Sequence, residues 1–137
     1  RNITVSTCGL VENIYALSKE NLQITLAISL HAPDQSIRES IMPIAKRYDI
    51  NEVILACKDY FEKTKRRISF EYSLIKGVND SSENACKLAK LLDGISCHVN
   101  LIAVNNVVEN TYKSPDKAQI EEFKNILQQI LFSKGFL

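Results

Sequence analysis

Several side chains that can hydrogen-bond a small ligand stand where predicted strands end. Ser6 closes one β-branched stretch, Ser29 and His31 close the next, and Asn105 follows the last one. A hydroxyl, an imidazole and a carboxamide brought to one edge could hold the polar end and the ribose of a small cofactor. Each residue also has an ordinary structural alternative, because Ser and Asn often cap helices or form turns and a lone His often bonds to a loop.

These side chains need strands to hold them, and the sequence predicts four short ones. β-Branched and alternating stretches cover residues 2–7, 23–30, 67–75 and 98–104. Helical spacing between and after the strands predicts five helices. The first carries Leu10, Ile14 and Leu17, the second runs from 33 or 34 to about 41 with Asp34 at its start, and the third covers 51–63. The fourth runs from Ser81 or Ser82 to Asp93 and Gly94, and the last begins at Ser114 and Pro115. Strands that alternate with helices indicate parallel βαβ units. The predicted fold class is therefore α/β, with about four βα units in a single domain over residues 1–137.

The predicted strand ends matter because ligands bind at the carboxyl ends of strands in barrels and open α/β sheets. Asn79, in the loop after the third strand, belongs to the same edge. The strands also have two unlike faces. In the third strand, Phe70 and Tyr72 alternate with Ser69 and Glu71. A parallel sheet covered on both faces is normally apolar on both, so the pattern predicts helices on one face and either a ligand-filled cavity, as in an incomplete barrel, or plain solvent on the other.

Charge and cysteine spacing limit the possible partners. The net charge of +1 gives no overall attraction to RNA or membranes. A local basic patch could come from Lys63, Lys65, Arg66 and Arg67, or from Lys46 and Arg47, although such runs are more often solvated helix ends. Cys8, Cys57, Cys86 and Cys97 lie far apart without a C-x-x-C pair, which predicts no metal site and no disulfide framework. With no leader and no apolar run of about 18 residues, we expect a reduced, cytoplasmic protein.

Five segments are familiar as a set: ITVSTCG, LAISLHAP, MPI, FEYSLIKGVND and HVNLIAVN. In this order they resemble the radical S-adenosylmethionine (SAM) methyltransferases of the RlmN type, which methylate adenine C2 in 23S ribosomal RNA and in certain transfer RNAs. The resemblance implies a partial (β/α)6 barrel with the cofactor across the carboxyl ends of its strands. The chain would be the C-terminal portion of that barrel.

The resemblance also assigns residues. It implies that Ser6, Ser29, Leu30, His31 and Asn105 contact S-adenosylmethionine. The family binds a 4Fe–4S cluster through C-x-x-x-C-x-x-C, and this motif and the two catalytic cysteines of the family have no counterpart in this sequence. No catalytic residue and no metal ligand is therefore assigned, the cluster would belong to a longer parent protein, and we expect the chain alone to be inactive.

Two departures and several alternatives accompany the resemblance. Ala103 stands where the family usually has proline, and the sequence stops following the family after about Leu131. The nearest alternative is the related resistance methyltransferase that modifies adenine C8. Others are a non-catalytic RNA-binding or partner-binding module, which would need a continuous basic surface, and an unrelated small α/β enzyme using Glu71 and His31. An exposed barrel edge with unpaired strands predicts that two copies associate as a homodimer.

Overall fold

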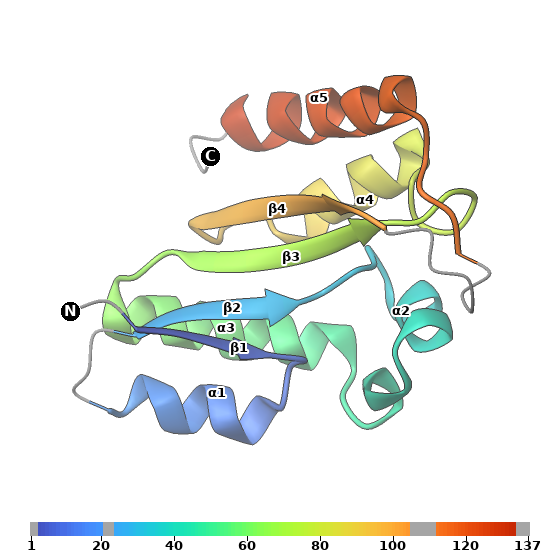
Figure 1. Ribbon diagram of the computed structural model, residues 1–137. Helices are drawn as coiled ribbons and strands as arrows, with labels where there is room; N and C mark the ends of the chain where they lie inside the picture. The colour runs from blue at the N-terminus through green and yellow to red at the C-terminus, as the bar shows by residue number, and fades with distance from the viewer. Residues whose placement is uncertain (1–2, 21–23, 105–111, 134–137) are drawn as a thin grey trace.

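The molecule is built on a sheet of four parallel strands in the order β1-β2-β3-β4, shown in the computed structural model of Figure 1, which describes residues 3–20, 24–104 and 112–133. The elements are β1 (Ile3–Thr7), α1 (Val11–Ser18), β2 (Ile24–Ser29), α2 (Gln35–Ile41), the 3-10 helix η1 (Pro43–Lys46), α3 (Ile50–Thr64), β3 (Ile68–Leu74), α4 (Ser82–Leu91), β4 (Cys97–Ala103) and α5 (Lys117–Ser133). The predicted α/β class and its four βα units are confirmed, and so are the four predicted strands to within one or two residues at each end.

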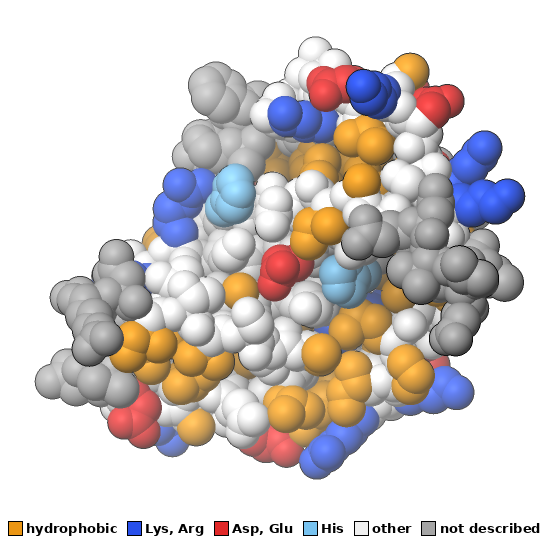
Figure 2. Space-filling model, viewed as in Figure 1, with side chains coloured by type: hydrophobic (Ala, Val, Ile, Leu, Met, Phe, Trp, Pro, Cys, Tyr) orange, Lys and Arg blue, Asp and Glu red, His pale blue; other side chains and the backbone are white. Residues whose placement is uncertain are grey.

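The helices leave one face of the sheet uncovered. α3 and α4 lie behind the sheet, while α1 and α5 flank its two edges (Figure 1). On β3 the side chains of Ile68, Phe70, Tyr72 and Leu74 are buried toward the helices, and the intervening side chains are half-buried. The opposite face is open, with white polar side chains and backbone across its middle (Figure 2). The alternation read from the sequence thus separates the core from an open, polar face.

Two of the helices begin at a side chain that caps them. The Asp34 carboxylate accepts a hydrogen bond from the backbone of Ile37 and caps α2. Ser81 caps α4 in a reciprocal pair with Asn84, as expected for a capping box. The sequence predicted Asp34 as a cap or a first-turn acid and either Ser81 or Ser82 as a cap, and the structure has Asp34 and Ser81 in the capping positions. Past the sheet's carboxyl edge, α2 and η1 carry the chain back toward α3 (Figure 1).

The predicted start of the last helix is wrong. α5 begins at Lys117, and the Asp116 carboxylate, rather than the Ser114 hydroxyl, accepts a hydrogen bond from the backbone of Gln119. A carboxylate is a strong cap and also interacts well with the positive end of the helix. Pro115 is buried ahead of the helix instead of forming its first turn.

Candidate functional site

Strand register places the predicted polar residues of the open face in rows. Ser6 is paired with Ala27, and that row continues through Ser69. One row closer to the carboxyl edge, Ser29 is paired with Glu71. Ser6 is exposed and Ser29 is half-buried. The two predicted serines therefore belong to the same face of neighbouring strands, one row apart, while Asn105 lies outside the described residues.

His31 follows β2 in an unusual conformation. Its φ is 59°, which is uncommon for a residue other than glycine. Its Nδ1 accepts a hydrogen bond of 2.8 Å from the backbone N–H of Ser73, at the end of β3. Because Nδ1 is an acceptor here, the ring proton belongs on Nε2. The described residues offer Nε2 no hydrogen-bond partner, which leaves it available to donate to a ligand.

Asn79 connects the ends of β2 and β3 from inside the protein. Its side chain is fully buried, and its Nδ2 donates to the carbonyls of His31 and Ser73, both at 2.8 Å. Its Oδ1 accepts from the backbone N–H of Ile75 at 2.7 Å. Both amide hydrogens and the carbonyl oxygen of Asn79 therefore bond within the protein. Asn79 thus holds the left-handed backbone at His31, called the His31 turn below, rather than facing a ligand.

The side chain of Leu30 is buried, and its backbone groups are hydrogen-bonded within the protein. Its side chain is 0% exposed and belongs to the hydrophobic core. Its backbone N–H donates to the carbonyl of Glu71 at 2.9 Å, and its own carbonyl accepts from Arg38 Nε at 3.1 Å. A contact of Leu30 with the cofactor is thus limited to its peptide surface and the remaining lone pair of its carbonyl.

Sequence reasoning missed Arg38, a buried cation beneath the strand ends. This side chain of α2 is 0% exposed and donates to three backbone carbonyls, those of Cys8, Ser29 and Leu30. Burial lowers the pKa of its guanidinium below the ordinary value. The signal in the sequence is weak: a single arginine in a short helix just after the predicted ligand loop.

The environment of His31 favours its neutral form. Burial is the main cause that lowers its pKa below the ordinary 6.5, Arg38 lowers it further, and Glu71 opposes both. Since the folded pKa lies below the unfolded one, the unfolded chain binds more protons between the two values. The stability associated with neutral His31 is therefore lost as the pH falls below about 6.5.

We expect the free energy of unfolding to fall less between pH 7 and pH 5 in His31→Asn than in the unmodified chain. Asn tolerates a positive φ but has no titrating ring. Urea unfolding at several pH values measures the two curves, and His98→Asn, on exposed β4, is the matched control. Parallel curves for the chain and His31→Asn would contradict the assignment.

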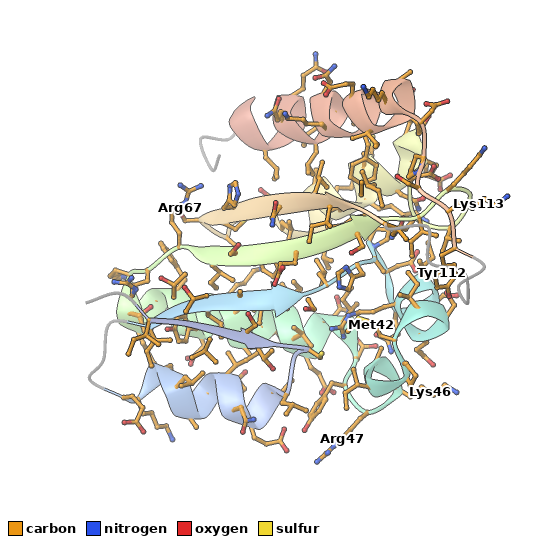
Figure 3. All side chains as sticks on the ribbon, viewed as in Figure 1. Met42, Lys46, Arg47, Arg67, Tyr112 and Lys113 are labelled. Carbon is orange, nitrogen blue, oxygen red and sulfur yellow. The ribbon has the colours of Figure 1, made fainter. Side chains whose placement is uncertain are left out.

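The candidate basic patches lie at opposite ends of the sheet. Arg67 is at the amino end of β3, whereas Lys46 and Arg47 are beyond the carboxyl edge (Figure 3). Several of these cations have local partners: Arg66 bonds Thr25 and Arg67 bonds the carbonyl of Cys97. These residues therefore do not form the continuous basic surface that a stand-alone RNA-binding module would need.

Metal binding was not predicted, and the described residues contain no group of three or more His, Cys, Asp or Glu side chains that could hold an ion. The four thiols are unpaired; Cys57 and Cys97 are buried, and Cys8 is exposed. In the described ranges no helix is both long and apolar enough to cross a membrane.

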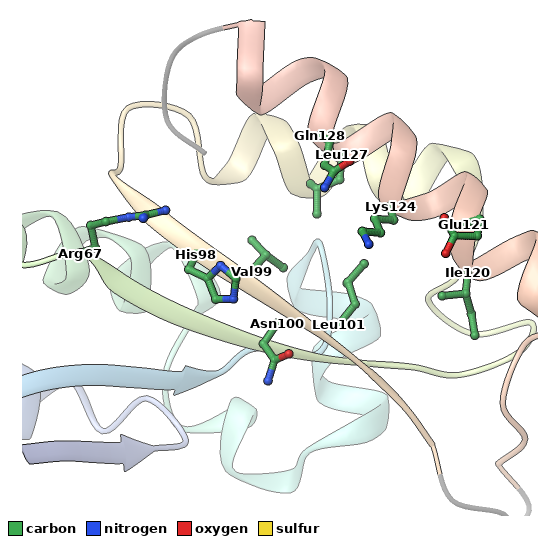
Figure 4. A pocket seen from close by; sticks show the side chains of 10 residues that line it. All are labelled: Arg67, His98, Val99, Asn100, Leu101, Ile120, Glu121, Lys124, Leu127 and Gln128. Carbon is green, nitrogen blue, oxygen red and sulfur yellow. The ribbon is translucent and has the colours of Figure 1, made fainter.

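A groove of about 630 Å³ runs along the outer edge of β4. Its walls are the edge strand and α5, with Lys124 and Leu127 of the helix facing Val99 and Leu101 of the strand (Figure 4). This groove lies away from the His31 turn. A smaller hollow of about 390 Å³ follows the other edge and is lined by Ser6 together with residues of α1.

The sequences of known proteins agree with the resemblance that the five segments carry. No family model matches the chain. The chain is 59% identical over 127 residues to a probable dual-specificity RNA methyltransferase RlmN of Clostridium acetobutylicum, and 53% identical over 129 residues to the protein of that name from Clostridioides difficile. These matches cover 93% and 94% of this chain but only 37% and 38% of the relatives.

Solved structures give the same result. A radical SAM methyltransferase from Sphaerobacter thermophilus superposes with a TM-score of 0.91 at 48% identity, over 93% of this chain and 38% of that one. A domain of a pyruvate-formate lyase-activating enzyme from Bacteroides vulgatus has a TM-score of 0.70 at 15% identity and shares the fold. The resemblance inferred from the five segments is confirmed, and the sheet corresponds to one section of such a protein.

Proposed function

We propose that this chain, which corresponds to a section of the RlmN-type radical SAM methyltransferases, supplies one side of the S-adenosylmethionine site of an enzyme that methylates adenine C2 of 23S ribosomal RNA and transfer RNA. The observation that carries the proposal is the His31 turn. Its Nε2 is left as a donor at the carboxyl edge, next to the hydroxyl-bearing face of β1 and β2. The whole of 1–137 would act as one folded unit.

The polar groups at this edge suit the cofactor. Hydroxyls of Ser6 and Ser29 and the Nε2 donor of His31 can bind the oxygen-rich ribose and carboxylate of S-adenosylmethionine, and Leu30 and Asn105 complete the set assigned by resemblance. When bound with its cluster, the cofactor supplies the methyl group and the radical chemistry. The cluster itself does not fit the described residues, because their four cysteines lie in separate parts of the fold and form no three-thiolate group. Its ligands would come from the parent protein.

Titration calorimetry with S-adenosylmethionine tests the rim. We expect the chain to bind in the millimolar range and His31→Asn combined with Ser29→Ala to bind at least about tenfold more weakly, a loss of about 1.4 kcal/mol. His98→Asn, in the same row of the open face as Ser6 but on β4, three strands away, should bind like the unmodified chain. No binding by the unmodified chain, or equal binding by the double variant, would count against the proposal.

RNA is the proposed partner of the whole enzyme, because the relatives are named as RNA methyltransferases, and its place would be the cytoplasm, where ribosomal and transfer RNA are found. The relatives' names favour the RlmN activity over the adenine C8 alternative. The separation of the basic groups to opposite ends of the sheet (Figure 3) favours a part of an enzyme over an independent RNA-binding module.

We also propose that two copies associate through the outer edge of β4. An unpaired edge strand is a template for another strand, and Val99, Leu101 and Leu127 add apolar surface to the groove beside this one, which polar side chains also line. Size-exclusion chromatography with light scattering should show a dimer that increases with concentration. Asn100→Lys, which places a charge on the exposed edge strand, should restore the monomer. Leu55→Lys, at an exposed position of α3, should not. A monomer at every concentration would refute the dimer.

A further inference from the structure

We propose that Arg38 is a positioning residue for the cofactor rim: its buried guanidinium ties the end of β1 to the end of β2 and so sets how Ser6, Ser29 and His31 are presented together. This inference rests on the proposed function, because it concerns the same edge. Arg38 itself is fully buried and does not touch the open face.

The donors of Arg38 are divided between two strands. Nη2 donates to the carbonyl of Cys8, directly after β1, at 2.8 Å and to the carbonyl of Ser29, the last residue of β2, at 3.0 Å. Nε donates to the carbonyl of Leu30 at 3.1 Å. One planar group thereby joins the backbone just after β1 to the last residue of β2 and the residue that follows it, beside the predicted cofactor contacts. A lysine could not reproduce this, because its three N–H donors share one nitrogen, whereas Nε and Nη2 of the planar guanidinium donate from two separate positions.

The surrounding backbone leaves space for this arrangement. A Cβ on Gly9 would lie 3.3 Å from Arg38 Nη2 and 3.1 Å from a methyl of Val53, and Gly9 has a φ of +93°. The glycine therefore allows the chain to turn after β1 close against the guanidinium. On the other side of Arg38, the Leu30 carbonyl that it holds precedes His31, whose own carbonyl is held by Asn79.

A simple stabilising role does not account for the arrangement well. Among the described residues, Arg38 donates to backbone carbonyls and not to a carboxylate, and its Nη1 is buried without a hydrogen-bond partner. Burying a charge in this way is costly, and an apolar side chain of similar volume is often no less stable. The benefit of the arginine is then the geometry that it gives to the two strand ends.

The test compares the chain with Arg38→Met, which keeps the volume without the donors, and Arg38→Lys, which keeps the charge without the planar fork. Amide hydrogen exchange followed by NMR reports on the turn without any ligand. In both variants we expect the N–H groups of Leu30 and His31, which bond to the Glu71 carbonyl, to exchange at least tenfold faster. The N–H of Leu92 at the end of α4, bonded to Leu88, serves as the internal control and should not change.

Calorimetry with S-adenosylmethionine supplies the second arm. We expect both variants to lose at least tenfold in affinity, with no rescue by lysine. Absence of binding by the unmodified chain would be a failure of the proposed function, and the exchange data would still decide the positioning role. Unchanged exchange at Leu30 and His31, unchanged affinity in either variant, or loss of the folded state in both would overturn the inference, the last because Arg38 would then support the whole fold.

Discussion

Asn79→Ala is expected to lower the free energy of unfolding by about 3 kcal/mol, because the substitution leaves several backbone groups without a partner in the interior. The N–H of Ile75 and the carbonyls of His31 and Ser73 all lose the bonds of 2.7 to 2.8 Å that the carboxamide makes. Water cannot replace these bonds readily, since Asn79 is 0% exposed. Urea unfolding measures the change.

The matched control is Asn100→Ala, which removes the same group from an exposed position on β4, and we expect it to cost less than about 0.5 kcal/mol. Asn79→Asp adds a second check. It keeps the acceptor for Ile75 but turns an oxygen toward two carbonyls, so it should be about as destabilising as alanine. Similar stabilities for Asn79→Ala and Asn100→Ala would show that the described bonds do not hold the turn.

Leu30→Ala is the second large expected effect, at about 3 kcal/mol, the usual cost of a cavity left by a fully buried leucine. The prediction follows from the position of Leu30 in the core, where its side chain is 0% exposed although it lies between two candidate ligand residues. The resemblance assigns Leu30 to the cofactor, whereas the structure gives its side chain to packing.

Leu55→Ala is the control for that prediction. Leu55 is 59% exposed on α3, so its replacement in a helix should change the free energy of unfolding by less than about 0.5 kcal/mol. Thermal or urea unfolding of both variants gives the comparison directly. Equal effects at the two positions would contradict the burial of Leu30.

The strands could be predicted because their signal is local. Alternation along Ile68–Leu74 directly reflects a sheet with one buried face, and Asp34 and Ser81 cap helices through contacts within a few residues. The start of α5 was misjudged because Ser114 and Asp116 can each cap a helix, and the sequence does not rank Ser114 below Asp116. The short helix η1 gave no periodic signal at all.

Only part of the candidate site could be predicted from the sequence. That Ser6, Ser29 and His31 come to one edge follows from strand ends, and the register bears out the shared face of the two serines. The fixation of His31 by Ser73 and Asn79 spans more than forty positions of sequence, so no local pattern reveals it. Arg38 is similar: a surface helix normally exposes its arginines, and only the folded chain shows this one buried beneath two strand ends.

The carboxyl edge around His31 is the proposed binding site of S-adenosylmethionine. Its most direct test is a map of amide chemical shifts, measured by two-dimensional NMR while the cofactor is added to the chain. We expect the shifts to concentrate on Ser6, Ser29 and His31 and to leave the amino ends of β3 and β4 unchanged. Shifts centred on the groove between β4 and α5, or no shifts at millimolar cofactor, would contradict it.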